Sequence, residues 1–239
     1  MKTDPSQDTW NMQWNLYNNA PYFKPNKKVL EEIQKCFNTN ITGKKILEIG
    51  AGSGSDIVYL SAWGAEAYAL DFSRESIRSI RSWSKKKMTS VQIVKADAKK
   101  IPYPDNKFDL VYSVGLMEHF IRVLPLLIEQ IRVVKPGGFL IIDVPQKYTL
   151  YTIAKHVRMS RNKHPCGWET EYSKGDLLKL AQKLEQPVHC IYGRDSDIIL
   201  KLPLYMRRLL SPIFSKTIEQ SRLGAYVCLC IGLVLQIKK

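Results

Sequence analysis

The sequence lacks several features that would by themselves assign it to a class of protein. Its five cysteines are scattered, odd in number and without a CxxC pair, so neither a disulfide framework nor a metal site is indicated. No apolar block follows a basic start within residues 1–30, which argues against a secretory signal. No internal repeat or low-complexity tract is present. We therefore expect residues 1–239 to form a single domain in a reducing, cytoplasmic compartment.

Long apolar runs are equally scarce. The longest covers residues 223–235, well short of the roughly 20 residues that a membrane span requires. Its Val, Ile, Cys and Tyr content is typical of a strand that is buried on both faces. We therefore expect this run to be the last strand of a sheet and not a membrane anchor.

Acidic residues are few relative to basic ones. The chain has 22 Asp and Glu against 36 Lys and Arg, which gives a net charge of +14. Such an excess favours an acidic partner, whether nucleic acid, an anionic membrane or a substrate with phosphate or carboxylate, and does not choose among them. Hydrophobic residues at 45% and charged residues at 24% are typical of soluble globular proteins, which excludes a disordered or collagen-like chain.

From residue 44 onward, short apolar segments alternate with segments of helical periodicity. Strands separated by helices predict a parallel sheet with right-handed crossovers, and such sheets bind ligands at the carboxyl ends of their strands. The predicted fold class is α/β: a doubly wound, Rossmann-like sheet of seven mostly parallel strands, with an antiparallel last strand. The predicted strands cover residues 45–50, 66–70, 91–96, 108–114, 138–144, 188–192 and 223–235. The predicted helices cover residues 6–19, 25–37, 56–63, 73–85, 121–134 and 174–184.

Within this domain we distinguish three parts. Residues 1–43 form an N-terminal helical cap, and residues 44–145 form the core of the sheet. Residues 146–239 contain a basic lid over 147–172, a basic, Leu-rich helical insertion over 200–221 and the closing strands.

A glycine-rich loop follows the first predicted strand and leads directly into a helix. Gly50, Gly52 and Gly54 let the backbone approach a ligand, and the helix N-terminus offers free N–H groups. The spacing differs from the G-x-G-x-x-G of nicotinamide dinucleotide enzymes, because the third glycine comes one residue early. Asp71 ends the second strand, where a carboxylate accepts hydrogen bonds from a ribose, with helix capping as the alternative. Asp97 ends the third strand and would reach the adenine edge of a nucleoside.

With these residues, the chain resembles the class I S-adenosylmethionine-dependent methyltransferases. It is most similar to their small-molecule branch (methyltransferase type 11), typified by ubiquinone and menaquinone biosynthesis enzymes. The matching segments are 46–54 (ILEIGAGSG), 70–73 (LDFS), 96–98 (ADA), 101–113 (IPYPDNKFDLVYS), 118–120 (EHF) and 134–141 (VKPGGFLI). This resemblance makes residues 44–145 a cofactor-binding core.

The resemblance implies transfer of the methyl group of S-adenosylmethionine to an O, N or C atom of a small or lipid-like acceptor, with S-adenosylhomocysteine as product. It implies that residues 50–54 wrap the methionine part of the cofactor and that Asp71 holds the ribose. Ser113 would lie beside the sulfonium, and Glu48 would order the loop. The implied cofactor-binding residues are Glu48, Gly50, Ala51, Gly52, Gly54, Asp71, Phe72, Asp97, Ala98 and Ser113.

Methyl transfer from a sulfonium requires mainly that the acceptor be aligned with the methyl group and that water be excluded. An alcohol, phenol or acidic carbon also benefits from a general base. His119 is the candidate for this role, with the alternative that it only shapes the pocket; Asp143 and His156 are weaker candidates. The predicted acceptor pocket consists of Tyr17, Tyr22, Glu118, His119, Trp168 and Tyr172, although core packing explains the aromatic residues almost as well.

Other functions are weighed against this one. The charge suits an RNA- or DNA-modifying methyltransferase, but the fourth strand ends in Tyr112-Ser113-Val114-Gly115, without the Asn/Asp-Pro-Pro-aromatic signature of base methylation, so nucleic acid is disfavoured. A cofactor-binding module without catalysis and a nicotinamide dehydrogenase are further alternatives. The insertion over 200–221 suits peripheral contact with an anionic membrane or an anionic, lipid-like substrate, with an ordinary helical cover as the alternative. A solvated face is the simplest explanation of the basic residues of the helix over 73–85. The oligomeric state is not predicted.

Overall fold

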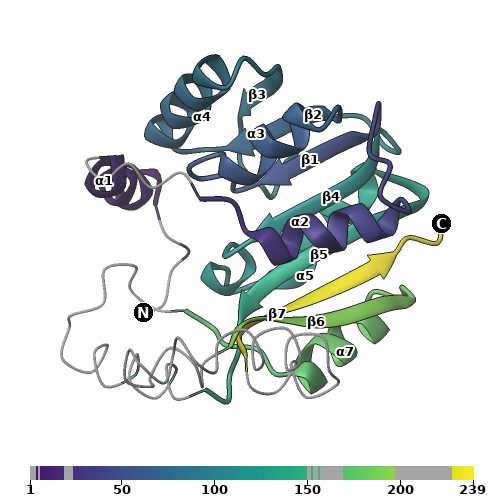
Figure 1. The fold of residues 1–239 in the computed structure, drawn as a ribbon. Coiled ribbons are helices and arrows are strands. Elements are labelled where there is room, and N and C mark those ends of the chain that lie inside the picture. The colour runs from purple at the N-terminus through teal and green to yellow at the C-terminus, as the bar shows by residue number, and fades with distance from the viewer. Residues whose placement is uncertain are drawn as a thin grey trace, which may run out of the picture.

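The computed structural model of the chain describes residues 4, 6–18, 24–149, 152, 156, 169–196 and 228–239. These residues form a seven-stranded sheet with helices on both faces (Figure 1). The strands are β1 (Lys45–Ile49), β2 (Glu66–Asp71), β3 (Val91–Lys95), β4 (Phe108–Val114), β5 (Val134–Pro145), β6 (Val188–Ser196) and β7 (Cys228–Gln236). The helices are α1 (Gln7–Asn18), α2 (Lys27–Cys36), α3 (Ser55–Ala62), α4 (Arg74–Lys86), the 3-10 turn η1 (Met117–His119), α5 (Val123–Val133) and α7 (Lys174–Lys183).

The strand order is β3-β2-β1-β4-β5-β7-β6, and the first five strands run parallel to one another. Strand β7 runs antiparallel to both of its neighbours, β5 and β6. The prediction of a seven-stranded, mostly parallel sheet with an antiparallel last strand is therefore confirmed. The strand order reverses direction at β1, which lies between β2 and β4, and such a switch point is where open α/β sheets bind ligands.

Two apolar layers cover the sheet. On one face, Ile46 packs in a layer with Ile33 of α2 and Ile57 of α3. On the other face, Leu47 packs in a layer with Leu126 of α5 and with α7. Because both faces are buried, the strands consist of nearly continuous apolar residues rather than an apolar-polar alternation.

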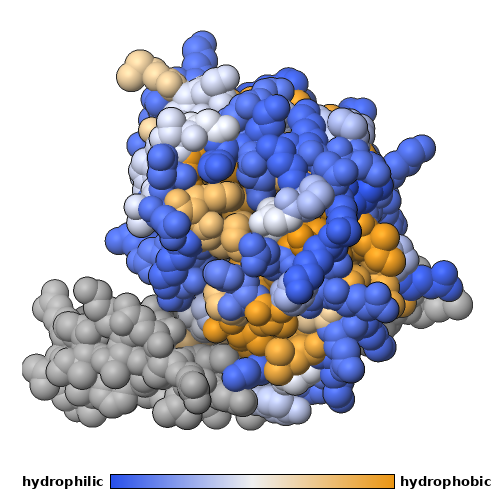
Figure 2. Space-filling view, turned by 90° about the vertical axis from the view of Figure 1, so that its right-hand side faces the viewer, coloured by the Kyte–Doolittle hydropathy of each residue, from blue (hydrophilic) through white to orange (hydrophobic). Residues whose placement is uncertain are grey.

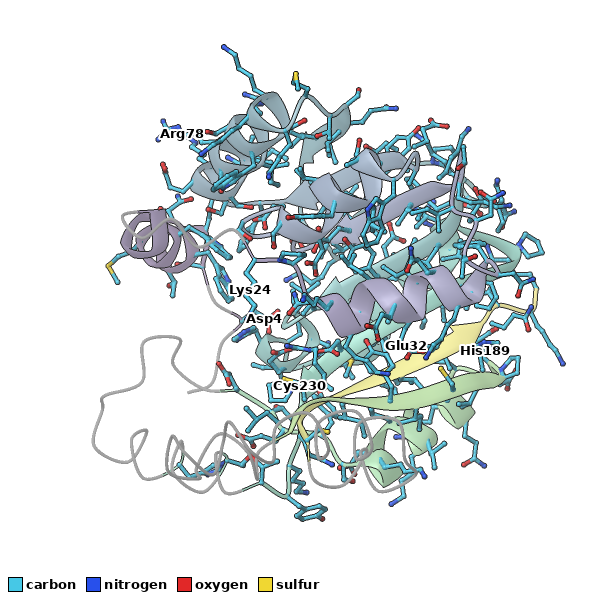
Figure 3. All side chains as sticks on the ribbon, in the orientation of Figure 1. Asp4, Lys24, Glu32, Arg78, His189 and Cys230 are labelled. Atoms are coloured by element: carbon cyan, nitrogen blue, oxygen red, sulfur yellow. The ribbon has the colours of Figure 1, made fainter. Side chains whose placement is uncertain are left out.

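Local side-chain interactions stabilise helices α4 and α2. Ser73 is the N-cap of α4, as predicted, and its side chain accepts a hydrogen bond from the Ser76 N–H. On α2, Glu32 pairs with Lys28 at 2.9 Å and with Lys35 at 2.8 Å (Figure 3). These pairs sit one turn apart on the same side of the helix and stabilise it.

Some boundaries differ from the prediction. Strand β5 begins at Val134, not at residue 138, because Val134 already pairs with Phe108 before a bulge leads to the next pair, Leu110 with Phe139. The last strand is described from Cys228; residues 223–227 and the insertion over 200–221 lie outside the described residues, as does most of the lid over 147–172. None of the helices in the described ranges is long and apolar enough to cross a membrane. The face of the molecule that lies away from α1 is mostly hydrophilic, with apolar patches between the polar residues (Figure 2).

Candidate functional site

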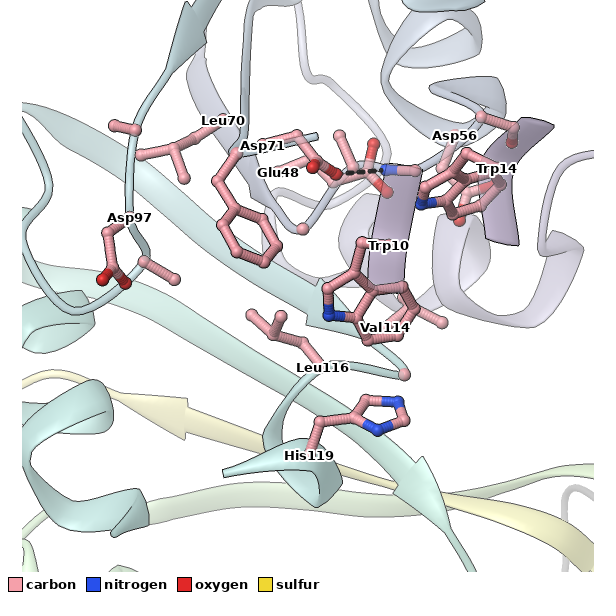
Figure 4. Close-up of a pocket in the computed structure, with 18 of the residues that line it drawn as sticks. Trp10, Trp14, Glu48, Asp56, Leu70, Asp71, Asp97, Val114, Leu116 and His119 are labelled. Carbon is pink, nitrogen blue, oxygen red and sulfur yellow. Dashed lines mark hydrogen bonds between the residues drawn. The ribbon is translucent and has the colours of Figure 1, made fainter. Parts of the chain in front are cut away.

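A cavity of about 210 Å³ lies at the carboxyl ends of β1, β2, β3 and β4, at the switch point of the sheet (Figure 4). Because these four strands are parallel, the residues that follow them meet at one edge of the sheet. The strands and the loops after them contribute Glu48, residues 50–53, 70–72, 96–99 and 114–116, His119 and Phe120. Asp4, Trp10, Trp14, Asn26, Ser55 and Asp56 complete the lining.

The glycine loop is held by groups from β2 and α4. The Gly50 N–H donates to the Leu70 carbonyl at 2.8 Å, and the Ser76 hydroxyl donates to the Gly52 carbonyl at 2.7 Å. Gly50 and Gly52 have φ angles of 67° and 52°, which side-chain-bearing residues rarely adopt. A Cβ atom at Gly52 would also collide with the indole of Trp14. The loop therefore requires glycine both for its backbone conformation and for the close approach of its neighbours.

Asp71 connects this loop to the end of β2. It is only 5% exposed, and its carboxylate accepts the Gly52 N–H at 2.9 Å and the Ser73 N–H at 2.8 Å. Burial raises the pKa of Asp71, and the two N–H groups oppose that effect. A carboxylate offers about four acceptor positions, so Asp71 has the capacity to hold the loop and to accept hydrogen bonds from a ligand in the cavity.

Two further buried carboxylates line the cavity. Glu48 accepts the Ile57 N–H at 3.3 Å, and Asp56 accepts both the backbone and the side-chain N–H of Asn26, at 2.7 and 2.8 Å. Burial raises the pKa of Glu48 well above its ordinary value, and the nearby charge of Asp56 raises it further. Burial also raises the pKa of Asp56, against the hydrogen bonds from Asn26. Both groups are therefore held closer to their neutral forms than exposed carboxyls are, and a positively charged ligand in the cavity would favour their ionised forms.

Helix α1 covers the cavity and supplies two residues that sequence reasoning missed. The ring of Trp10 contacts His119 edge to face, with centroids 4.8 Å apart, and Trp14 lies over Gly52. Asn11 anchors the helix, because its side-chain oxygen accepts hydrogen bonds from the Ser73 hydroxyl and the Arg74 N–H, both at 3.0 Å. Two tryptophans spaced by four residues on one helix were the available signal for this cover.

Eight of the ten residues predicted to bind the cofactor line the cavity, and Gly54 and Ser113 do not. Gly54 is the N-cap of α3 with a φ angle of 74°, and Ser113 is 1% exposed within β4. For all ten residues, contact with the cofactor stays a prediction. Asn26 and Asp56, which the prediction omitted, belong to the same wall, but no motif in the sequence marks them.

Of the residues predicted for the acceptor pocket, only His119 lines the cavity in the described structure. Glu118, which precedes His119 in the chain, and Tyr172 are buried but do not line the cavity, and the Glu118 carbonyl accepts the Thr170 N–H at 2.9 Å. Tyr22, Trp168 and the side chain of Tyr17 lie outside the described residues.

The two weaker candidates for a base lie away from the cavity lining and have partners of their own. Asp143 pairs with Arg194 at 2.8 Å, and His156 lies 3.1 Å from Glu171. Among the described residues, no group of three or more His, Cys, Asp or Glu side chains is arranged to hold a metal ion.

The fold is the one seen in S-adenosylmethionine-dependent methyltransferases. The structure superposes on such a methyltransferase from Aquifex aeolicus with a TM-score of 0.57 and 21% sequence identity, over 87% of this chain and 89% of that one. Residues 47–142 match the family model of the methyltransferase domain.

Two relatives show where the similarity lies. A fatty-acid O-methyltransferase of Mycolicibacterium smegmatis is 32% identical over 114 residues, which cover 46% of this chain and 41% of the relative. A demethylmenaquinone methyltransferase of a Geobacillus species is 32% identical over 126 residues, which cover 51% of this chain and 53% of the relative. The chain therefore aligns with about half the length of these relatives.

Proposed function

We propose that the chain transfers a methyl group from S-adenosylmethionine to a small or lipid-like acceptor. The observation that carries the proposal is the buried Asp71 carboxylate, which lines the cavity at the end of β2 and holds the glycine loop through the Gly52 N–H. The two relatives act, by their names, on a fatty acid and on demethylmenaquinone, which favours a lipid-like acceptor.

The residues of the cavity fit the chemistry of this cofactor. The glycine loop leaves its backbone accessible to the methionine part, and Asp71 offers acceptors to the ribose hydroxyls. The aliphatic side chains of Leu70 and Ala98 form an apolar wall suited to a flat adenine. The positive charges of the sulfonium and the amino group would favour the ionised forms of the buried Glu48 and Asp56.

The chemistry that the cofactor supplies is a methyl group already activated by the positive sulfonium. The residues of the chain then have to align the acceptor and exclude water. Trp10 and Trp14 on α1 cover the cavity and serve the second task. His119 is 4% exposed and lines the cavity, where it would accept the proton that a hydroxyl or acidic carbon loses during transfer.

The cofactor is tested by thermal unfolding with S-adenosylmethionine, S-adenosylhomocysteine and NAD in parallel. A ligand at about 100 times its Kd adds about 2.7 kcal/mol, which should raise Tm by about 5–10 °C for a chain of this size. We expect shifts with the first two ligands only. A shift with NAD alone, or no shift with any ligand, would refute the proposal.

The acceptor is tested with methyl-labelled cofactor and three separate pools: fatty acids, quinone precursors and RNA. Label in a lipid pool is the expected result. Label in RNA alone would mean that the acceptor is a nucleic acid. If the chain binds the cofactor but transfers label to none of the three pools and to no component of a cell extract, it is a module that binds the cofactor without catalysis.

A further inference from the structure

Half of the net charge of the chain is concentrated in one short region. Residues 73–100 contain nine Lys and Arg and two acidic residues, so they carry +7 of the total of +14. They comprise α4, from Arg74 to Lys86, and β3, which is the edge strand of the sheet. The charge is therefore located along one edge of the sheet, where α4 runs from the cavity end, at Ser73, to the opposite end.

Within this region, basic side chains form a stripe along α4. The stripe consists of Arg74, Arg78, Arg81 and Lys85, whose spacing of four, three and four residues places them on one face of the helix. All four are exposed, whereas Ile77 and Ile80 are buried against the sheet. Arg78 extends outward from α4, away from the sheet (Figure 3). Glu75 is the only acidic residue of the helix and pairs with Arg78.

Exposed apolar side chains lie at both ends of the stripe. Met88 follows the last turn of α4 and is 93% exposed. Met12 on α1 is 64% exposed, and the neighbouring Asn11 accepts a hydrogen bond from the Arg74 N–H at the first turn of α4. We call the stripe together with Met12 and Met88 the α4 surface. It combines spread positive charge with isolated flexible apolar side chains.

We propose that the α4 surface docks on an anionic lipid membrane. Clusters of four to eight Lys and Arg on a helix adsorb to anionic lipid headgroups. Exposed methionine side chains can then insert into the apolar acyl-chain layer beneath the headgroups. Helix α1 links this surface to the cavity, because Asn11 contacts the start of α4 while Trp10 and Trp14 line the cavity. Docking would bring the cavity close to lipids. The value of this position for catalysis rests on the proposed lipid-like acceptor, whereas the docking itself does not.

Nucleic acid would also be attracted by the charge, but two aromatic residues nearby, Trp83 and Tyr59, are only partly exposed and already lie near lysines. Single-stranded RNA binds by stacking bases on open aromatic rings. Here the Lys86 ammonium lies 4.7 Å from the centre of the Trp83 ring, and the Lys87 ammonium lies 5.9 Å from that of Tyr59. A base that stacks on either of these two rings would have to displace a lysine, whereas a headgroup layer requires no aromatic ring.

The test is co-sedimentation of the full chain with two kinds of vesicle: pure phosphatidylcholine, and phosphatidylcholine with about one-third phosphatidylglycerol. We expect binding to the anionic vesicles only, and weaker binding as salt is added. The variant Arg78→Gln/Arg81→Gln/Lys85→Gln should weaken binding by about tenfold or more, because it removes three charges from the stripe.

The matched control is Lys179→Gln/Lys183→Gln/Lys238→Gln, which removes the same charge from exposed residues of α7 and the final segment. It should retain most of the binding. Equal losses in the two variants would show that total charge and not the α4 surface is responsible, and would overturn the proposal. Tighter binding of a single-stranded RNA than of the anionic vesicles, lost in the stripe variant, would also overturn it.

The thermal shift with S-adenosylmethionine, measured on both variants, keeps this test separate from the proposed function. None of the substituted residues lines the cavity, so the shift should be the same as in the unmodified chain. Loss of vesicle binding with a normal shift supports the docking surface. Normal vesicle binding without any shift would refute the methyltransferase proposal alone.

Discussion

The indole of Trp10 and the imidazole of His119 meet edge to face, with ring centroids 4.8 Å apart and planes at 85° (Figure 4). Trp10 belongs to the N-terminal helix α1, and His119 to the turn η1 beyond β4. The contact joins the cover of the cavity to the residue proposed as the general base. It also restricts the orientations that the imidazole ring can take.

Replacement of Trp10 tests whether α1 is part of the acceptor site. We expect Trp10→Ala to lower kcat and to raise the acceptor KM, because both the cover and the support of the imidazole are lost. Trp10→Phe keeps an edge-to-face partner and should restore most of the activity. An edge-to-face pair contributes about 0.5–1.5 kcal/mol, so the free energy of unfolding should fall by at least that amount in the alanine variant. Steady-state kinetics of Trp10→Ala equal to those of the unmodified chain would exclude α1 from the site.

Asp71→Ala should raise the Kd for S-adenosylmethionine more than tenfold. The lost hydrogen bonds to a charged carboxylate contribute roughly 1.5–3 kcal/mol each. The measurement is titration calorimetry, with Asp105→Ala as the control, because Asp105 is exposed and does not line the cavity. A near-normal Kd for Asp71→Ala would refute the assignment of Asp71 to the ribose.

His119→Ala should leave the Kd for the cofactor intact and lower kcat by about 10²–10⁴-fold, the usual contribution of a general base. The pH profile of kcat should lose its acidic limb, because that limb reports the protonation of the base. Single-turnover kinetics with labelled cofactor would measure both effects. An unchanged kcat would reduce His119 to a residue that shapes the pocket.

Gly52→Ala separates backbone strain from steric conflict when it is compared with Gly137→Ala. Both glycines have positive φ angles, 52° and 77°, and the left-handed conformation costs a residue with a side chain roughly 1–2 kcal/mol. A Cβ at Gly137 meets nothing within 4 Å, whereas a Cβ at Gly52 collides with Trp14. We expect urea unfolding to show a larger loss for Gly52→Ala, together with weaker cofactor binding. Equal losses of unfolding free energy in the two variants would mean that the Trp14 side chain moves aside without an energetic cost.

The raised pKa of Glu48 predicts that the free energy of unfolding decreases as pH rises. Burial, followed by the charge of Asp56, raises the pKa of Glu48 well above its ordinary value, so the folded chain binds this proton more tightly than the unfolded chain. The contribution of this proton to the free energy of unfolding is fully present below about pH 4, the ordinary pKa range of a glutamate. It is lost as pH rises through the pKa of Glu48 in the folded chain. Within that window the slope reaches about −1.4 kcal/mol per pH unit.

We therefore expect Glu48→Gln to flatten the decline of the free energy of unfolding with pH, measured by urea titration in a pH series. Asp109→Asn is the control of opposite sign. Burial raises the pKa of Asp109, but Lys135 and the Lys45 N–H outweigh it and lower the pKa. Its contribution is present at neutral pH and disappears as pH falls below the ordinary Asp range. An unchanged slope in Glu48→Gln would contradict the expected proton binding.

Much of the fold was predictable because its signals are local. Apolar runs bounded by glycine or by a capping serine such as Ser73 locate the strands and helices around the cavity to within a few residues. The early start of β5 was not predictable, since it depends on Val134 pairing with Phe108 across a bulge. A pattern within one segment contains no information about the partner strand.

Local patterns in the chain were sufficient to predict that the glycine loop, Asp71 and Asp97 lie at one edge of a parallel sheet, because each ends a strand that runs in the same direction as its neighbours. In contrast, long-range packing is what brings Trp10 and Trp14 over that edge and adds Asp56 to its acidic wall. The position of α1 over the cavity depends on contacts with residues far along the chain, such as those of Asn11 with Ser73 and Arg74. Helical periodicity specifies that such a helix forms, but packing specifies what it covers.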